Sequence, residues 1–154
     1  ISYICIQYLP ICLSMLISVS QLPVPVLFLY CIVVAFLLIY LPFLAVAYAR
    51  LSLGYDYFAP RAMFDKLPSY AQRATWAHQN SFETFMNFAV AALMAYTTGV
   101  TSELAAWAAL SFITARLFYS VFYIFNIPIL RSLMYAIGLA SSCTLFVLSI
   151  IQAS

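Results

Sequence analysis

Apolar residues in this chain come in long runs, and these runs predict its elements. A helix that crosses a bilayer needs about 20 mainly apolar residues. Four runs reach that length, over residues 25–49, 74–97, 104–126 and 129–152. The pattern predicts an all-α integral membrane protein built as a four-transmembrane-helix bundle, with one long polar loop at residues 50–73.

The first 24 residues form an N-terminal extension with a further apolar run. Pro10 interrupts this run, and the segment QLPVP at residues 21–25 ends it. The run lacks the basic start of an intact signal peptide, and a first residue other than Met suggests processing or an incomplete N-terminus. An extra span, an interfacial segment and the remnant of a targeting sequence all fit this pattern.

Composition narrows the class of protein and its partners. Hydrophobic residues make up 67% of the chain and charged residues 6%, whereas a soluble domain has about 25% charged residues. The main partner is therefore expected to be the lipid bilayer. The net charge of +2 comes without a cluster of Lys and Arg, which argues against nucleic acid as a partner.

Cysteine and histidine give no pattern typical of a metal site. The four cysteines all lie in apolar runs, without CxxC spacing, and are expected to be small buried hydrophobic residues. They are Cys5, Cys12, Cys31 and Cys143. The single histidine, His78, has no second His or Cys partner, so zinc and haem are not supported. We expect His78 to contact a neighbouring helix or the membrane interface.

The basic residues predict an orientation in the membrane. Five cations lie in or beside the 50–73 loop and the 126–131 connection, which share one side of a four-span bundle. They are Arg50, Arg61, Lys66, Arg73 and Arg131. The opposite turn, at residues 97–103, carries only Glu103. The positive-inside rule places the basic side in the cytoplasm or its equivalent, although the sequence does not identify which membrane this is.

Two spans carry polar strips. On a helix with 100° per residue, the strip of the second span occupies a sector of about 80°. It consists of Arg73, Trp76, Asn80, Glu83 and Asn87. The third span has a similar strip, consisting of Arg116, Tyr119, Tyr123 and Asn126. Charges and amides inside a membrane usually pair with each other or line a polar cavity.

Glu83 and Arg116 are the opposite charges of these strips. Each lies about 10 residues, or ~15 Å, from the basic side, so antiparallel helices would bring them to the same depth. The sequence therefore predicts a Glu83–Arg116 ion pair between neighbouring helices, which as a neutralised pair would also suit a purely structural clamp.

A group of polar side chains is expected above that pair, toward the basic side. Together they would form a funnel into the membrane, whose cations, amide and phenols suit an anionic polar ligand. The group consists of Arg73, Asn80, Tyr119, Tyr123 and Arg131.

Two stretches resemble the paired signatures of the MAPEG family, the membrane-associated proteins of eicosanoid and glutathione metabolism. They are AHQNSFETF at residues 77–85 and ARLFYSVFYIFNIPILRSLMYAIG at residues 115–138. The resemblance covers roughly residues 25–152. It implies a left-handed four-helix bundle that assembles as a homotrimer. Glutathione would bind between subunits and open to the cytosolic side, and the acceptor would enter from the lipid.

The resemblance also implies roles for individual residues. Arg131, followed by Ser132, matches the arginine that stabilises the thiolate of glutathione, so these two are the expected catalytic residues. The expected glutathione-binding residues are Arg73, Asn80, Glu83, Arg116, Tyr119 and Tyr123. Two positions depart from the family pattern: Trp76 and Gln79 stand where glutathione-using members often carry arginine.

Three functions are consistent with these observations. The first is a glutathione-dependent transferase or peroxidase acting on a lipophilic electrophile or a lipid hydroperoxide. The second is a non-catalytic lipid-binding scaffold, which would need a groove open sideways to the bilayer. The third is a structural subunit of a larger membrane complex, respiratory or photosynthetic, whose neighbouring subunits would be its partners.

Overall fold

The computed structural model describes residues 22–154, so the predictions for residues 1–21 lie outside the described part. Helices form nearly all of that part. They are α2 (Val24–Ser52), the short 3-10 helix η1 (Phe64–Lys66), α3 (Ser69–Thr97), α4 (Glu103–Ile124) and α5 (Pro128–Ala153). The four long helices correspond to the four predicted spans, except that α4 ends two residues before the predicted end at residue 126, and no strand forms within residues 22–154.

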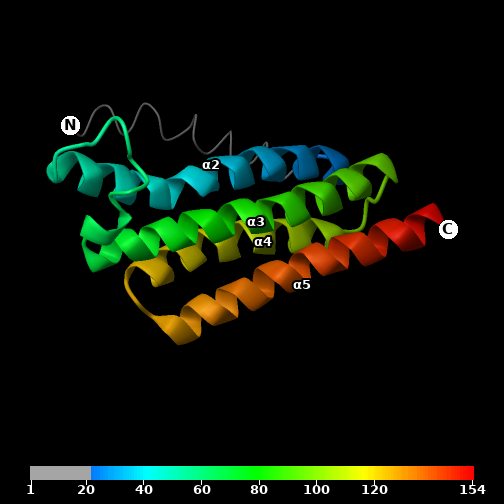
Figure 1. Cartoon of the computed structure of the whole chain (residues 1–154). Helices are drawn as coiled ribbons and strands as arrows, with labels where there is room; N and C mark the ends of the chain where they lie inside the picture. Colours follow the sequence, from blue (N-terminus) through cyan, green and yellow to red (C-terminus); the bar gives the residue numbers. More distant parts are fainter. Residues whose placement is uncertain (1–21) are drawn as a thin grey trace, which may run out of the picture.

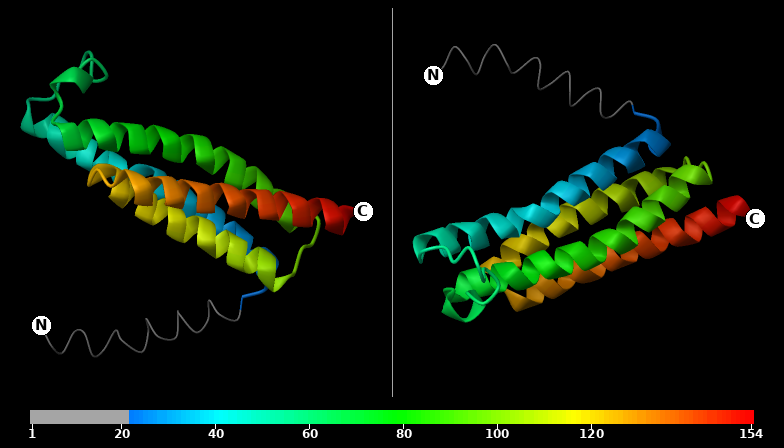
Figure 2. Two further views of the ribbon diagram at one scale, coloured as in Figure 1. Left: turned by 90° about the horizontal axis from the view of Figure 1, so that it is seen from below. Right: turned by 45° about the horizontal axis from the view of Figure 1, so that its top comes forward.

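The long helices run along one another as an up-and-down bundle (Figure 1). α3 and α4 occupy the middle, and they separate α2 on one side from α5 on the other (Figure 2). One end of the bundle carries the 53–68 loop and the connection at residues 125–127, and we call it the loop end. The opposite end carries the 98–102 turn, and we call it the turn end.

Local sequence explains most helix boundaries. Pro25 and Pro128 lie in the first turns of α2 and α5, where the missing proline N–H removes no helical hydrogen bond. The hydroxyl of Ser102 caps α4 by accepting from the N–H of Ala105 at 3.3 Å. Gly99 and Asn126 follow α3 and α4 with φ of 72° and 61°, a left-handed conformation that glycine and asparagine tolerate best.

The polar loop is shorter than predicted. It was expected over residues 50–73, but α2 continues to Ser52 and α3 begins at Ser69. Arg50 and Arg73, counted as loop cations in the sequence, therefore belong to helices. Polar residues in the last and first turns of a long membrane helix lie beyond the hydrocarbon core, so they do not end the helix.

The apolar core is largest toward the turn end. Its largest side chains are Phe28, Phe88, Phe112 and Leu145. The rings of Phe88 and Phe112 stack with 3.9 Å between centroids and 4° between planes, and several alanines of α3 and α4 allow the backbones to approach. A smaller core lies at the loop end, formed by Val46, Ala49, Leu67, Ala71 and Ala74.

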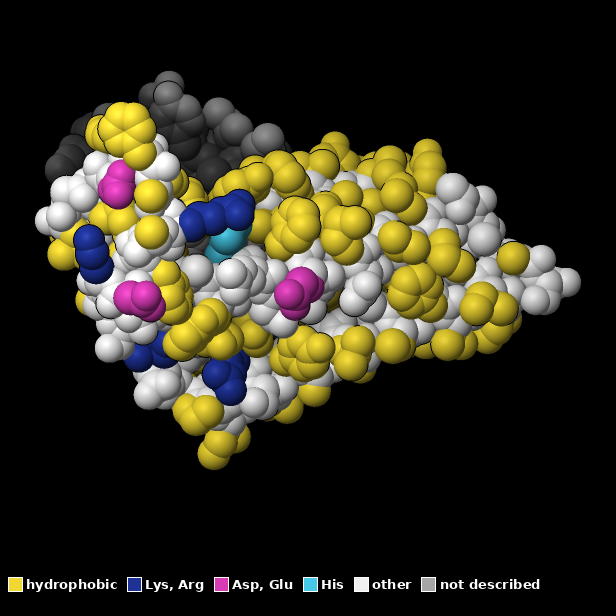
Figure 3. Space-filling model, viewed as in Figure 1, with side chains coloured by type: hydrophobic (Ala, Val, Ile, Leu, Met, Phe, Trp, Pro, Cys, Tyr) yellow, Lys and Arg dark blue, Asp and Glu magenta, His cyan; other side chains and the backbone are white. Residues whose placement is uncertain are grey.

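The outer surface also differs between the loop end and the rest of the bundle. Among the described helices, α2, α4 and α5 are long and apolar enough to cross a membrane. Figure 3 shows hydrophobic side chains along most of the length, while Lys and Arg gather at the loop end. α3 does not reach the same hydropathy, because it carries the polar residues of the 73–88 stretch.

Candidate functional site

Arg116 is a buried cation in the middle of the bundle. It projects from α4, is 4% exposed, and donates from Nη2 to Asn80 Oδ1 at 3.0 Å and to Ser81 Oγ at 3.2 Å. Its Nε and Nη1 atoms are also buried, and they have no hydrogen-bond partner among residues 22–154. The guanidinium therefore has two nitrogen atoms whose N–H groups meet no acceptor among the described residues.

The predicted Glu83–Arg116 ion pair is wrong. The structure forms no salt bridge between them; Arg116 bonds to Asn80 and Ser81, and Glu83 lies on the exposed side of α3. On a helix of 100° per residue, Arg116 faces the direction midway between positions 80 and 81, and position 83 points about 110° away from it. The prediction compared only the depths of the two charges and left out their directions around the helix.

The tyrosines of α4 connect Arg116 to Arg131. The Arg116 guanidinium lies 4.1 Å from the ring centre of Tyr119, and the Tyr119 and Tyr123 rings meet edge to face at 5.5 Å. Arg131, in the first turn of α5, lies 4.7 Å from the ring centre of Tyr123. We call these four residues the Arg–Tyr ladder. It runs from the loop end into the bundle, so the structure brings this part of the predicted funnel together.

The remaining predicted residues lie around the ladder in different settings. Arg73 donates from Nε to the carbonyl of Ile124 at 3.0 Å, so it caps the C-terminal end of α4, where a cation is favoured. Asn80 belongs to the Arg116 contact. Ser132 follows Arg131 and is exposed.

A small cavity lies beside Arg116, and a large cleft lies elsewhere. The cavity has a volume of about 10 Å³ and is lined by residues of α3, α4 and α5, including Asn87, Tyr135 and Ser142. That is about the space of one water molecule. A ligand the size of a peptide cannot enter it in the single chain.

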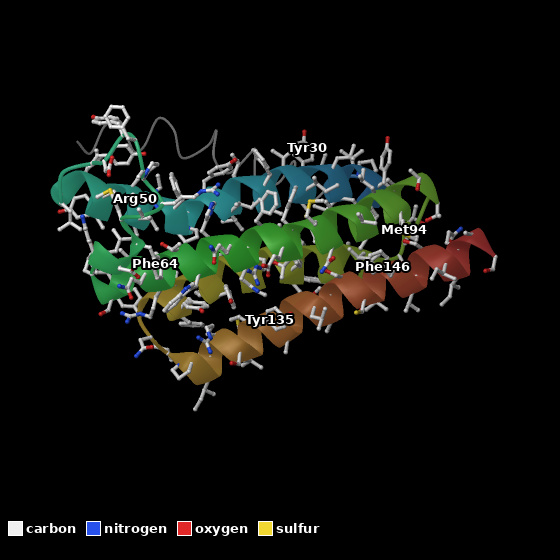
Figure 4. The ribbon with its side chains drawn as sticks, viewed as in Figure 1. Tyr30, Arg50, Phe64, Met94, Tyr135 and Phe146 are labelled. Carbon is white, nitrogen blue, oxygen red and sulfur yellow. The ribbon has the colours of Figure 1, made fainter. Side chains whose placement is uncertain are left out.

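The large cleft opens between α2, the 53–68 loop and α3, with a volume of about 760 Å³. Figure 4 shows Arg50 of α2 and Phe64 of the loop at this end of the bundle. The lining residues are Phe43, Val46, Arg50, Arg61, Phe64, Thr75, His78, Gln79, Phe82 and Glu83. The cleft thus combines two cations, a carboxylate and apolar rings, and it lies on the other side of α3 from the Arg–Tyr ladder.

Arg50 and Arg61 are candidate site residues that the sequence did not single out. Both were interpreted only as indicators of membrane orientation. The Nε of Arg50 is buried and has no hydrogen-bond partner within residues 22–154. Arg50 directly follows the predicted apolar run of residues 25–49, but only the fold shows that it lines one cleft together with Gln79 and Glu83.

His78 contacts the neighbouring helix, as expected. Its Nδ1 lies 2.7 Å from the carbonyl oxygen of Ile39 in α2, and because a carbonyl only accepts, Nδ1 carries the proton. Pro42 lies three residues after Ile39 inside α2. A proline ring displaces the carbonyls of the preceding turn, and polar side chains of neighbouring helices commonly bond to such carbonyls in membranes.

Two other expectations can be compared with the structure. Trp76 is 42% exposed and packs against the Phe64 ring at 5.7 Å, so it covers the edge of the loop and does not enter the ladder.

The cysteine prediction is confirmed for Cys31, which is buried, but it is wrong for Cys143, which is exposed. Cys143 lies on the outward side of α5, where an apolar run faces away from the bundle.

The comparison with known families agrees with this arrangement. The model of the MAPEG family matches residues 27–151, which contain all four long helices except the ends of α2 and α5. The chain belongs to the MAPEG family. This MAPEG protein is accordingly an integral membrane helical bundle. No curated protein and no solved structure matched the chain.

Proposed function

We propose that this MAPEG protein is a glutathione-dependent transferase or peroxidase acting on a lipophilic electrophile or a lipid hydroperoxide. The observation that carries the proposal is Arg116, a buried guanidinium with two free donors and no carboxylate bonded to it. A charge at that depth in a membrane is costly unless an opposite charge meets it. An anionic ligand would supply that charge.

Glutathione has the chemistry that suits the ladder. It carries two carboxylates and a thiol, and the loop end offers Arg73 and Arg131 in addition to Arg116. The phenols of Tyr119 and Tyr123 add polar contacts between the cations. In the proposed arrangement, Asn80 completes the binding residues on the ladder side of α3, and Glu83, which lines the large cleft on the other side of α3, would contribute from a neighbouring copy.

The proposed reaction needs a thiolate. A fixed cation lowers the pKa of a thiol, and the thiolate is the nucleophile. Arg131 would stabilise the thiolate, with the hydroxyl of the adjacent Ser132 as a hydrogen-bond donor. The sulfur would then form a bond to the electrophilic carbon of the acceptor, and the leaving group would depart with its electron pair while the thiol proton passes to solvent.

The site would be completed by a second copy of the chain. The outward side of α3 carries Gln79, Glu83 and Asn87 at four-residue spacing, and all three are exposed in the single chain. Polar and charged groups facing lipid are unfavourable, which supports burial of this side in a homotrimer. The cleft with Arg50 and Arg61 would then lie next to a neighbouring copy, with the loop end on the cytoplasmic side.

Isothermal titration of glutathione into the detergent-purified protein tests the proposal. We expect binding in the intact protein and at least about tenfold weaker binding in Arg131→Ala, because each desolvated charge contact contributes about 2–5 kcal/mol. Lys66→Ala is the matched control, since Lys66 is an exposed loop cation away from the ladder. Absence of binding in the intact protein would contradict the proposal, as would equal effects of the two substitutions.

A lipid-binding scaffold is the second candidate, and one observation favours it. A groove of about 390 Å³ opens between α4 and α5, lined mainly by apolar residues that include Trp107, Phe118 and Ile137. Both helices are apolar enough to span a membrane, so the groove would face acyl chains. Copurified lipid without glutathione binding would favour this function, and copurified protein subunits would favour a structural role in a larger complex.

A further inference from the structure

The tip of the 53–68 loop exposes two aromatic side chains. Tyr57 is 80% exposed, and Phe58 is fully exposed in the single chain. An isolated exposed apolar residue is ordinary on a protein surface. Two adjacent aromatic rings on a loop at the end of a transmembrane bundle are different, because the bilayer surface lies close by.

The tip is a folded structure, and its hydrogen bonds hold the rings outward. The Asp56 carboxylate accepts from the backbone N–H groups of Phe58 and Ala59 at 2.9 Å and 3.1 Å. The N–H of Asp56 donates to the sulfur of Met63 at 3.4 Å, and Met63 is buried. The rings of Tyr55 and Tyr57 meet edge to face at 4.9 Å. The exposure of the tip is therefore a consequence of how the loop folds.

The loop lies beside one end of a helix that is apolar enough to span a membrane. Figures 1 and 2 show it turning back beside the C-terminal end of α2, where it does not extend far beyond the helix along the bundle axis. Tyr48 and Leu51, on the outward side of that end of α2, are strongly exposed, and so is Leu53 at the start of the loop. An exposed apolar strip thus leads from the membrane-spanning helix to the loop.

We propose that Tyr57 and Phe58 insert into the headgroup layer of the surrounding bilayer and anchor the loop there. Aromatic residues are enriched at this layer because their rings are amphipathic. Arg61 and Lys66 are exposed cations of the same loop, but two exposed aspartates of the loop balance their charge, so the two rings and not attraction to anionic lipid carry the anchor. The occupant of this surface is therefore lipid.

The anchor also determines where the large cleft opens. Arg61 and Phe64 belong to the loop and line the cleft, so fixing the tip at the bilayer surface fixes one wall of the cleft opening. The cleft then opens at the depth of the lipid headgroups. This inference does not depend on the proposed glutathione chemistry, because it concerns only the loop and the bilayer.

Fluorescence quenching in lipid vesicles tests the anchor. Phe58→Trp is placed in a background without the natural indoles, made by Trp76→Phe and Trp107→Phe, and the protein is reconstituted in phosphatidylcholine with an anionic lipid. Lipids brominated near the headgroup end of the acyl chains should quench the new indole strongly, and its emission should shift to shorter wavelength. Asp65→Trp, in η1 of the same loop, is the matched control and should be quenched mainly by aqueous iodide.

Two outcomes would overturn the proposal. If iodide quenches the indole at position 58 as well as it quenches the one at position 65, the tip lies in water. If neither quencher reaches position 58, protein covers the tip, either residues 1–21 or a second copy. Phe58 has no buried contacts to lose, so a melting temperature equal to that of the background protein will show that the variant is folded.

Discussion

The two halves of the bundle are packed in different ways. Toward the turn end, α3 and α4 meet through alanines and the stacked Phe88 and Phe112 rings, within one continuous apolar core. Toward the loop end the core is small, and the space beside it holds cations, tyrosines and a cleft. The difference indicates that one half supplies most of the packing. The other half can therefore hold polar groups in arrangements that do not favour stability.

Loss of the aromatic stack should have the largest effect on stability. Phe88→Ala removes a fully buried ring and should lower the free energy of unfolding by about 3–5 kcal/mol, measured by denaturant titration in detergent micelles. Phe58→Ala removes the same atoms from an exposed site at the loop end and should change stability little. Equal losses in the two variants would show that packing is not concentrated toward the turn end.

Removal of the buried charge should weaken ligand binding, while the stability of the fold stays the same or rises. Arg116→Met removes a cation with two unpartnered donors. The free energy of unfolding should stay the same or rise by about 1–4 kcal/mol, while glutathione binding weakens. Parallel denaturant and calorimetric titrations of the intact protein and the variant check both effects.

The same substitution distinguishes a binding residue from a structural clamp. If Arg116→Met destabilises the fold as much as Phe88→Ala does, Arg116 holds α3 and α4 together through Asn80 and Ser81. Arg116 would then contribute to the packing of the bundle, as the residues toward the turn end do.

The hydrogen bond between His78 and the carbonyl of Ile39 should contribute moderately to the free energy of unfolding. His78→Phe keeps a ring among Tyr40 and Phe43 but leaves the Ile39 carbonyl without its 2.7 Å donor. The expected loss is about 1–2 kcal/mol in the free energy of unfolding. His78→Asn places an amide N–H near the position of Nδ1 and should recover part of it. No difference between the two variants would exclude the hydrogen bond as the cause.

The helix cap at the turn end should give the smallest effect. Ser102→Ala removes the acceptor for the N–H of Ala105 and should cost about 1 kcal/mol, measured as a shift of the thermal midpoint. Ser102→Asp keeps an acceptor and should retain most of the stability. A larger loss in Ser102→Asp than in Ser102→Ala would contradict the capping role.

The four helices could be predicted from the sequence because apolar runs of membrane length are strong signals. The direction of each side chain around its helix could not be predicted to better than a wide sector. Glu83 was the only partner expected for Arg116, and the packing of α3 on α4 brings Asn80 and Ser81 to it instead.

The large cleft could not be predicted from the sequence for a related reason. The 53–68 loop places Arg61 and Phe64 opposite α3 through contacts that involve Asp56 and Met63, and no periodicity reports such contacts. The cations of the loop therefore indicated a side of the membrane but not a wall of a cleft. The family match covers the helices as a set and leaves these details to the individual sequence.

The polar contact between α3 and α4 has a consequence for biosynthesis. α3 is the helix that falls short of the hydropathy of the others, so it is a poor candidate for entering the membrane alone, whereas α4 is apolar enough to cross although it carries Arg116. Paired as a hairpin through the 98–102 turn, they satisfy part of each other's hydrogen bonding through Arg116, Asn80 and Ser81. We expect the translocon to release them together. A chain truncated before α4 should leave α3 outside the bilayer.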